Sequence, residues 1–276
     1  MAAKPTIVVT GCSTGIGAHC ARRLREDGWL VIASARKEED IARLKSEGFE
    51  ALFLEKRDPG SIKQFFDQAM ELTDGKLDAL FNNAGYAQPG AVEDLPIEAL
   101  REQFEVNFFA YHQLILRAVP VMRKQGSGRI VNCSSVLGRV AMPWRGAYTS
   151  SKFALNALTT TLRMELEGTG IYASLIEPGS IPSNIAANGA RYAMKYIQLD
   201  KSPHQEKYRR RFEDLVSQKP PVDLSGAEPV YTALRKALSA RRPRPHYPVK
   251  PETRVAIALD RVLPKDILYR LLNRMA

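Results

Sequence analysis

Residues 6–17 read TIVVTGCSTGIG, and this stretch decides the fold. The β-branched run from Thr6 to Thr10 is typical of a buried strand. Three glycines follow, Gly11, Gly15 and Gly17, and then a segment of helical period, so the glycines stand at a strand-to-helix turn. In such a turn the first glycine permits the tight bend, the second lets the backbone approach a pyrophosphate, and the third lets the helix pack against the sheet. Because the helix N-terminus offers unpaired N–H groups to phosphate, we expect a dinucleotide-binding loop, with a ligand-free glycine turn as the alternative.

The remaining sequence alternates short apolar runs with segments of helical period, which is the pattern of βαβ units and a parallel sheet. The expected strands are Thr6–Thr10, Leu30–Ser34, Ala51–Leu54, Ala79–Asn82, Arg129–Cys133 and Tyr172–Glu177, and the expected helices include His19–Arg25, Ile62–Leu72, Leu100–Arg123 and Ala154–Glu167. We therefore expect one α/β domain over residues 1–276, with a Rossmann-type doubly wound parallel sheet of about seven strands and helices on both faces. A polar, basic stretch begins near Pro182, and we interpret residues 184–225 as a helical insertion over a site.

The composition fits one globular domain and excludes several classes of protein. The chain has 276 residues, of which 45% are hydrophobic and 25% charged. Three cysteines without CxxC spacing and four scattered histidines indicate neither a disulfide framework nor a metal site, so we expect a reducing, cytoplasmic location. There is no signal-peptide pattern and no apolar run of bilayer length. The net charge is +10, but the late basic clusters lack the interleaved aromatic residues of a nucleic-acid platform, so we expect no nucleic-acid partner.

The second predicted strand ends without the carboxylate that would bond the ribose of NAD. It runs instead into Arg36 and Lys37. The forked guanidinium of Arg36 suits a 2′-phosphate, Lys37 adds positive charge, and Ser13 of the glycine loop adds a hydroxyl group. We therefore expect NADP(H). The alternative is that Arg36 and Lys37 simply begin a solvated helix.

A tyrosine and a lysine provide the candidate acid–base chemistry. Tyr148 and Lys152 are four residues apart at the start of a helical pattern, so both side chains lie on one face a turn apart. An ammonium group beside a phenol favours the phenolate, so we expect Lys152 to lower the pKa of Tyr148 toward neutral pH.

These motifs together resemble the short-chain dehydrogenase/reductase family. The glycine loop has that family's Thr-Gly-x-x-x-Gly-x-Gly spacing, and five further motifs follow in order up to residue 183. The resemblance implies that the catalytic residues are Asn107, Ser135, Tyr148 and Lys152. It implies a cofactor site formed by Gly11, Ser13, Thr14, Gly15, Ile16, Gly17, Arg36, Lys37, Asp58, Asn83, Ala84, Gly85, Tyr148, Lys152, Pro178, Ile181 and Ser183.

Within that resemblance each motif has a distinct role. Ser135 would donate to the substrate oxygen, and Asn107 would hold a helix backbone open to a water linked to the lysine. Asp58 would contact the adenine, although taken alone it looks like a helix cap. Residues 178–183 would meet the nicotinamide carboxamide, with Ser183 in place of the family's threonine.

The resemblance also suggests a substrate and partners. Aromatic and apolar residues of the insertion, Tyr192, Met194, Tyr196, Ile197 and Phe212, and the late segments 247–250 and 263–272 resemble the steroid and retinol dehydrogenase branch, so we expect a lipophilic carbonyl or alcohol substrate. The family's members pair through long helices, here Leu100–Arg123 and Tyr148–Glu167, which implies a homodimer or homotetramer.

Three further possibilities are open at this stage. For the amphipathic tail, core packing or a subunit contact is favoured over peripheral contact with an acidic membrane. The alternative functions are an epimerase or dehydratase of the extended branch and an NADPH-sensing regulator without turnover.

Overall fold

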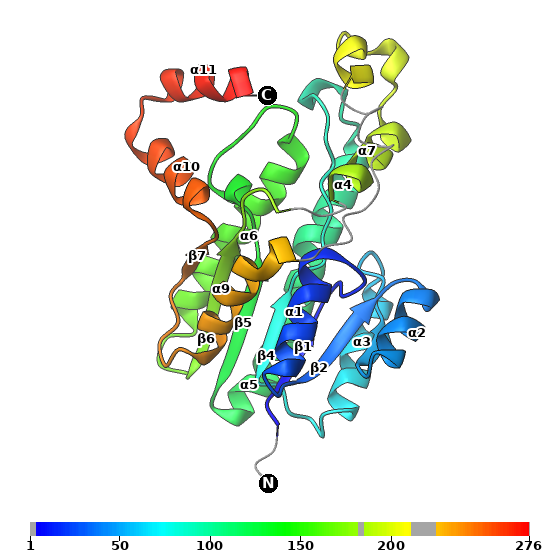
Figure 1. Cartoon of the computed structure of the whole chain (residues 1–276), viewed down its shortest axis with the longest axis vertical. Helices are drawn as coiled ribbons and strands as arrows, with labels where there is room; N and C mark the ends of the chain where they lie inside the picture. Colours follow the sequence, from blue (N-terminus) through cyan, green and yellow to red (C-terminus); the bar gives the residue numbers. More distant parts are fainter. Residues whose placement is uncertain (1–3, 182–184, 211–224, 276) are drawn as a thin grey trace.

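A computed structural model of the chain describes residues 4–181, 185–210 and 225–275, and it confirms the expected doubly wound fold (Figure 1). All strand pairs are parallel, in the order β3-β2-β1-β4-β5-β6-β7. The strands are β1 (Thr6–Val9), β2 (Leu30–Ala35), β3 (Glu50–Phe53), β4 (Ala79–Asn82), β5 (Gly128–Cys133), β6 (Ile171–Glu177) and β7 (His246–Pro248). The two halves of the sheet therefore diverge between β1 and β4, and a crevice forms at such a switch point beyond the carboxyl ends of the strands.

Helices cover both faces of the sheet, which is why the central strands are almost continuously apolar. One face packs against α1 (Gly15–Glu26), α2 (Glu38–Ser46) and α9 (Glu228–Ser239), and the other against α3 (Pro59–Glu71), α5 (Ala110–Gln125) and α6 (Gly146–Glu165). Side chains of β1 alternate between the two cores, with Ile7 and Val9 in the first and Val8 in the second, and all three are fully buried. Short 3-10 turns occur at Val92–Asp94 (η1), Val136–Gly138 (η3), Leu199–Lys201 (η4) and Ser225–Ala227 (η5).

The predicted continuous helix Leu100–Arg123 is wrong in one respect. The chain forms α4 (Ile97–Phe104), then a π-helical turn, η2 (Glu105–Phe109), and only then α5. Asn107 lies in this turn and is fully buried. Its side-chain Oδ1 accepts a hydrogen bond from Tyr86 N at 3.2 Å, and its Nδ2 donates to Tyr86 O at 2.9 Å. A π-turn of this kind often marks a functional site, and here it turns a polar side chain toward the segment after β4.

The C-terminal part of the chain forms α10 (Pro251–Val262) and α11 (Lys265–Met275), which extend from the sheet at the same end of the molecule as α7 (Ile185–Tyr196) (Figure 1). Leu268 is buried, but six apolar side chains of these two helices are exposed: Val255, Leu259, Val262, Ile267, Tyr269 and Leu271. Within the predicted tail, residues 263–272, Leu268 is buried while Ile267, Tyr269 and Leu271 are exposed, so core packing holds for Leu268 and the alternative of a subunit contact stays a prediction. Within the described ranges, no helix is long and apolar enough to span a bilayer.

Candidate active site

The glycine loop after β1 is shaped by close approaches that leave no room for side chains. Gly11 has φ +75°, and a Cβ there would lie 2.7 Å from Cβ of Ala84. A Cβ on Gly17 would overlap Gly11 O and lie 2.6 Å from Nδ2 of Asn83. The third glycine is thus required by the loop itself and by the segment after β4, and not by packing against the sheet as the sequence suggested.

The N-terminus of α1 is suited to a phosphate group. Thr14 is the N-cap residue, yet its side chain makes no capping hydrogen bond, and the first turn contains no acidic residue. The first N–H groups of a helix have no acceptor within the helix, and the helix dipole favours an anion there. The cradle formed by Gly11, Gly15 and Gly17 therefore fits the pyrophosphate of a dinucleotide.

The segment after β4 is tied directly to the end of β1. Oγ1 of Thr10 accepts hydrogen bonds from Asn83 N at 2.8 Å and from Ala84 N at 3.0 Å, while Asn83 Nδ2 donates to Thr10 O at 3.0 Å. The predicted cofactor residues Asn83, Ala84 and Gly85 are part of an Asn-Asn-Ala-Gly motif at residues 82–85, and this segment thus lies against the glycine loop. The side chain of Asn83 holds the two segments together, and Ala84 is small enough to face Gly11.

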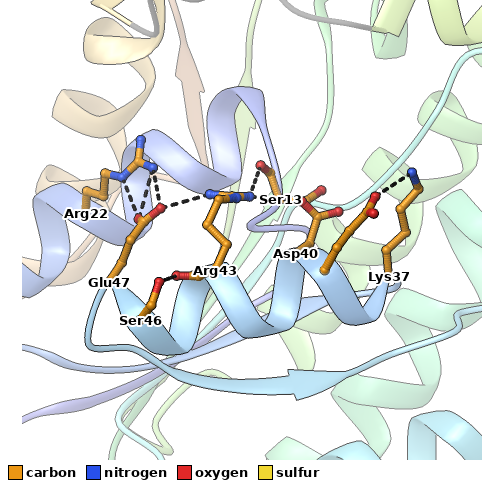
Figure 2. Close-up of polar contacts among 8 residues, drawn as sticks. Ser13, Arg22, Lys37, Asp40, Arg43, Ser46 and Glu47 are labelled. Carbon is orange, nitrogen blue, oxygen red and sulfur yellow. Dashed lines mark hydrogen bonds and ion pairs between the residues drawn. The ribbon is translucent and has the colours of Figure 1, made fainter.

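The end of β2 carries the two basic residues predicted to select NADP(H). Arg36 is 55% exposed by its side chain and lies 4.0 Å from Glu55, so its guanidinium is only loosely held. Lys37 precedes α2 and forms an ion pair with Glu39 at 2.9 Å (Figure 2). The guanidinium of Arg36 is therefore better placed than the ammonium group of Lys37 to bind a 2′-phosphate.

Arg43 is a residue at this end of the site that the sequence analysis missed. Figure 2 shows its guanidinium between Glu47, which follows α2, and Ser13 of the glycine loop, and its Nη2 donates to Ser13 O at 2.8 Å. It also bonds Asp40 and Glu47, each at 3.0 Å. Arg43 therefore fixes the backbone of Ser13 in the glycine loop. Its spacing from Glu47 indicated only a helix-surface ion pair, so the sequence held no signal for this contact.

Four further predicted cofactor positions have other contacts, are buried or lie outside the described residues. Asp58 caps α3 by accepting from Gly60 N at 2.8 Å, and its contact with an adenine stays a prediction. After β6, Pro178 O accepts from Val136 N at 2.8 Å, and Ile181 is buried. Ser183 falls outside the described residues.

Tyr148, Lys152 and Ser135 come together where β5 meets α6. All three are buried, with exposures of 8%, 3% and 8%. Ser135 and Tyr148 share a hydrogen bond between their side chains, and Ser135 Oγ also accepts from Leu137 N at 3.1 Å. Lys152 Nζ donates to Cys133 O at 2.7 Å and lies 5.7 Å from the centre of the Tyr148 ring.

The charge states of this group differ from the expectation. Burial raises the pKa of Tyr148 above its ordinary value, and the hydrogen bond from Ser135 lowers it by less. Burial lowers the pKa of Lys152 to about 8. The predicted lowering of the Tyr148 pKa by Lys152 is therefore wrong for the chain alone, because the ammonium group lies over the ring and bonds the Cys133 carbonyl. Tyr148 is held as a phenol, a proton donor.

Ser134, the neighbour of Ser135, has a structural role. Its Oγ donates to Asn156 Oδ1 at 2.5 Å, and Asn156 Nδ2 donates to Gly138 O at 2.9 Å. This pair anchors the loop from residue 134 to 138 on α6. The hydroxyl group of Ser135 is thereby left as the one that faces Tyr148.

The helix α7 packs over the segment after β4. The rings of Tyr86 and Tyr192 stack with centroids 4.1 Å apart, and a Cβ on Gly189 would lie 2.6 Å from Ala87 O. Glu102 of α4 bonds both Lys195 and Tyr196 of α7. An aromatic and apolar cover thus lies against the segment that follows the predicted cofactor motif.

Comparisons with known proteins agree with this geometry. Residues 5–192 match the family model described as short chain dehydrogenase. The chain is 36% identical over 270 residues to the oxidoreductase YbbO of Escherichia coli K12, covering 98% of this chain and 94% of that protein. It is 30% identical over 283 residues to the NADPH-dependent 3-dehydrocapnine reductase of Ornithobacterium rhinotracheale, covering 97% of each. It is also similar to the crystal structure of a short-chain dehydrogenase from Streptomyces avermitilis, with a TM-score of 0.76, 25% identity, and coverage of 99% and 98%.

The variant Gly17→Ala tests the glycine cradle. The added methyl group would overlap Gly11 O, so we expect dinucleotide affinity, measured by fluorescence titration or calorimetry, to fall by at least about tenfold. Gly75→Ala is the matched control, because Gly75 has φ +73° with nothing within 4 Å, so it carries backbone strain far from the loop. Wild-type affinity in Gly17→Ala would show that this loop does not hold the cofactor.

Proposed function

The chain belongs to the short-chain dehydrogenase family, and from that premise we propose that it is an NADP(H)-dependent oxidoreductase acting on a lipophilic carbonyl or alcohol. It is an NAD(P)-binding oxidoreductase of this family; the preference for NADP(H) and the class of substrate are the proposal. The observation that carries it is the buried group of Tyr148, Ser135 and Lys152 at the carboxyl end of the same sheet that carries the glycine cradle.

Each residue of the site has a separate role in the proposed reaction. Bound nicotinamide supplies or accepts the hydride. In reduction, Tyr148 protonates the carbonyl oxygen, and Ser135 donates a hydrogen bond to that oxygen as its charge develops. Lys152 holds a proton that can restore the phenol of Tyr148, and it binds the nicotinamide ribose. Burial of all three side chains excludes water and strengthens their electrostatic interactions.

The preference for NADP(H) is supported by Arg36 at the end of β2, where a family member specific for NAD would have a carboxylate. The similar protein of Ornithobacterium rhinotracheale is named as NADPH-dependent, which agrees with this assignment. Lipophilic substrates are supported by the aromatic cover on α7, where Tyr192 stacks on Tyr86. We propose that the insertion predicted at residues 184–225, of which the structure describes 185–210 and 225, forms the substrate lid within one domain spanning residues 1–276.

We also propose a homo-oligomer and a cytoplasmic location. Large apolar side chains are exposed on and beside α5 and α6, at Phe109, Leu116, Phe153 and Met164, and an interface would cover them. The exposed apolar residues of α10 and α11 offer a second surface, for a subunit or for an anionic membrane. The cytoplasmic location is supported by the three free, buried cysteines, Cys12, Cys20 and Cys133.

The first prediction concerns cofactor choice. Arg36→Ala removes a charge-assisted contact to the 2′-phosphate, so we expect KM for NADPH to rise by about tenfold or more, with KM for NADH nearly unchanged. Lys37→Ala is the matched control, with an expected change under about threefold, because Lys37 is already paired with Glu39. Equal effects of Arg36→Ala on the two cofactors would remove the basis of the NADP(H) assignment.

The second prediction concerns the proton donor. Tyr148→Phe keeps the ring and its packing but removes the hydroxyl group, so we expect kcat to fall by about 100-fold or more while NADPH still binds. Circular dichroism and NADPH fluorescence check folding and binding. Near-wild-type turnover in a folded, NADPH-binding Tyr148→Phe protein would refute the mechanism.

The third prediction concerns pH. Because Tyr148 remains a phenol while Lys152 loses its proton near pH 8, we expect kcat/KM for carbonyl reduction to be level below about pH 8 and to decrease above it. The profile is measured from pH 6 to 10, and the NADPH concentration is verified to be saturating at each pH. A profile that stays level to pH 10 would contradict a proton held by Lys152.

A further inference from the structure

A second buried lysine lies close to the candidate active site. Lys56 follows β3 by three residues and is only 7% exposed. Its Nζ donates to Val106 O at 2.7 Å and to Ala84 O. Lysine is rarely buried unless its ammonium group has partners, and here the partners are two backbone carbonyls on different segments.

The two carbonyls belong to the segments that form the site. Ala84 lies between Asn83 and Gly85, directly against the glycine cradle. Val106 precedes Asn107 in the π-helical turn η2. Since the side chain of Asn107 bonds the backbone of Tyr86, Lys56 and Asn107 both span the gap between the segment after β4 and η2.

Lys56 and the catalytic Lys152 face the same aromatic ring. The Nζ of Lys56 lies 4.9 Å from the centre of the Tyr111 ring, and the Nζ of Lys152 lies 5.4 Å from it. Both nitrogen atoms therefore lie within 5.4 Å of the centre of one ring. Burial, and then the charge of Lys152, lower the pKa of Lys56 well below its ordinary value.

We propose that Lys56 is a positioning residue of the hydride-transfer site: it clamps the segment after β4 to the turn that carries Asn107, and its ammonium group is coupled to that of Lys152. This inference rests on the proposed function. Lys56 acts through Ala84, Val106 and the shared Tyr111 ring. The lysine gives two backbone carbonyls beside the reaction centre a charged hydrogen-bond donor.

The charged and titratable groups around the two lysines define the coupling. Lys56 faces Lys152, Glu55 and Arg36, and it lies on the ring of Tyr111. Lys152 faces the Cys133 thiol and the rings of Tyr148 and Tyr111. The charge of Glu55 raises the pKa of Lys56, while those of Lys152 and Arg36 lower it, and Lys152 has the larger effect of these three.

Kinetics of Lys56 variants test the clamp. Lys56→Met keeps the length and apolar stem but loses the donors, so we expect kcat to fall about tenfold, with Kd for NADPH and KM for the substrate changed less than about threefold. Lys56→Arg retains the donors and the charge, so its kcat should be at least about threefold higher than that of Lys56→Met. The exposed Lys76→Met is the control and should leave kcat unchanged. A Lys56→Met protein with lower thermal stability but wild-type kcat would reduce Lys56 to a structural role and overturn the proposal.

Lysine titration tests the coupling without any turnover. With selectively labelled lysine, NMR follows the Lys56 signal, identified by its absence in Lys56→Met. In Lys152→Met the opposing charge is gone, so the Lys56 midpoint should move to higher pH by roughly half a unit to one unit. An identical midpoint in wild type and Lys152→Met would overturn the coupling.

The two experiments separate this proposal from the proposed function. If wild-type protein transfers no hydride to any substrate, the proposed function fails, yet the Lys56 titration still reports on its coupling to Lys152. If wild-type protein is active and Lys56→Met matches it in kcat, only the inference about Lys56 fails.

Discussion

The rest of the structure depends on the contact between the end of β1 and the segment after β4. Parallel strands bring their carboxyl ends to one edge, and the reversal of strand order between β1 and β4 opens that edge. Thr10 bonds Asn83 and Ala84 there, and position 11 must be glycine because a Cβ on Gly11 would lie 2.7 Å from Cβ of Ala84. Because this contact fixes the glycine cradle on one side and the segment facing η2 on the other, cofactor site and reaction centre are parts of one rigid edge.

Two buried lysines determine the electrostatics of this edge of the sheet. Both Lys56 and Lys152 lie among apolar and aromatic side chains, and each directs its ammonium group to backbone carbonyls. Desolvation therefore lowers the pKa of each lysine, while it raises that of Tyr148. The outcome is a phenol that keeps its proton beside an amine whose pKa is about 8, and these are the states that protonation of a carbonyl oxygen requires.

Motifs of fixed spacing, and elements with a regular repeat of apolar residues, were predictable from the sequence. Contacts between residues far apart in the sequence were not. The six early strands and the glycine loop followed from local pattern, and the order of motifs identified Tyr148, Lys152 and Ser135 together. The π-turn at Asn107 broke the predicted helix because a tertiary contact with Tyr86 favours it, and helical period cannot show that. The sequence pattern did not single out Arg43 or Lys56, because their roles depend on Ser13 O, Ala84 O and Val106 O, which only the folded chain brings near them. The direction of the Tyr148 pKa was wrong because spacing alone does not show where an ammonium group points.

The central claim is that this edge of the sheet transfers a hydride from NADPH to a carbonyl carbon. The most direct measurement uses NADPH with both hydrogens at C4 of the nicotinamide replaced by deuterium, together with a panel of lipophilic ketones and aldehydes, and locates the deuterium in the products by mass spectrometry and NMR. The account predicts deuterium on the carbon that bears the new hydroxyl group. Demonstrable NADPH binding with no deuterium in any product across the panel would contradict it.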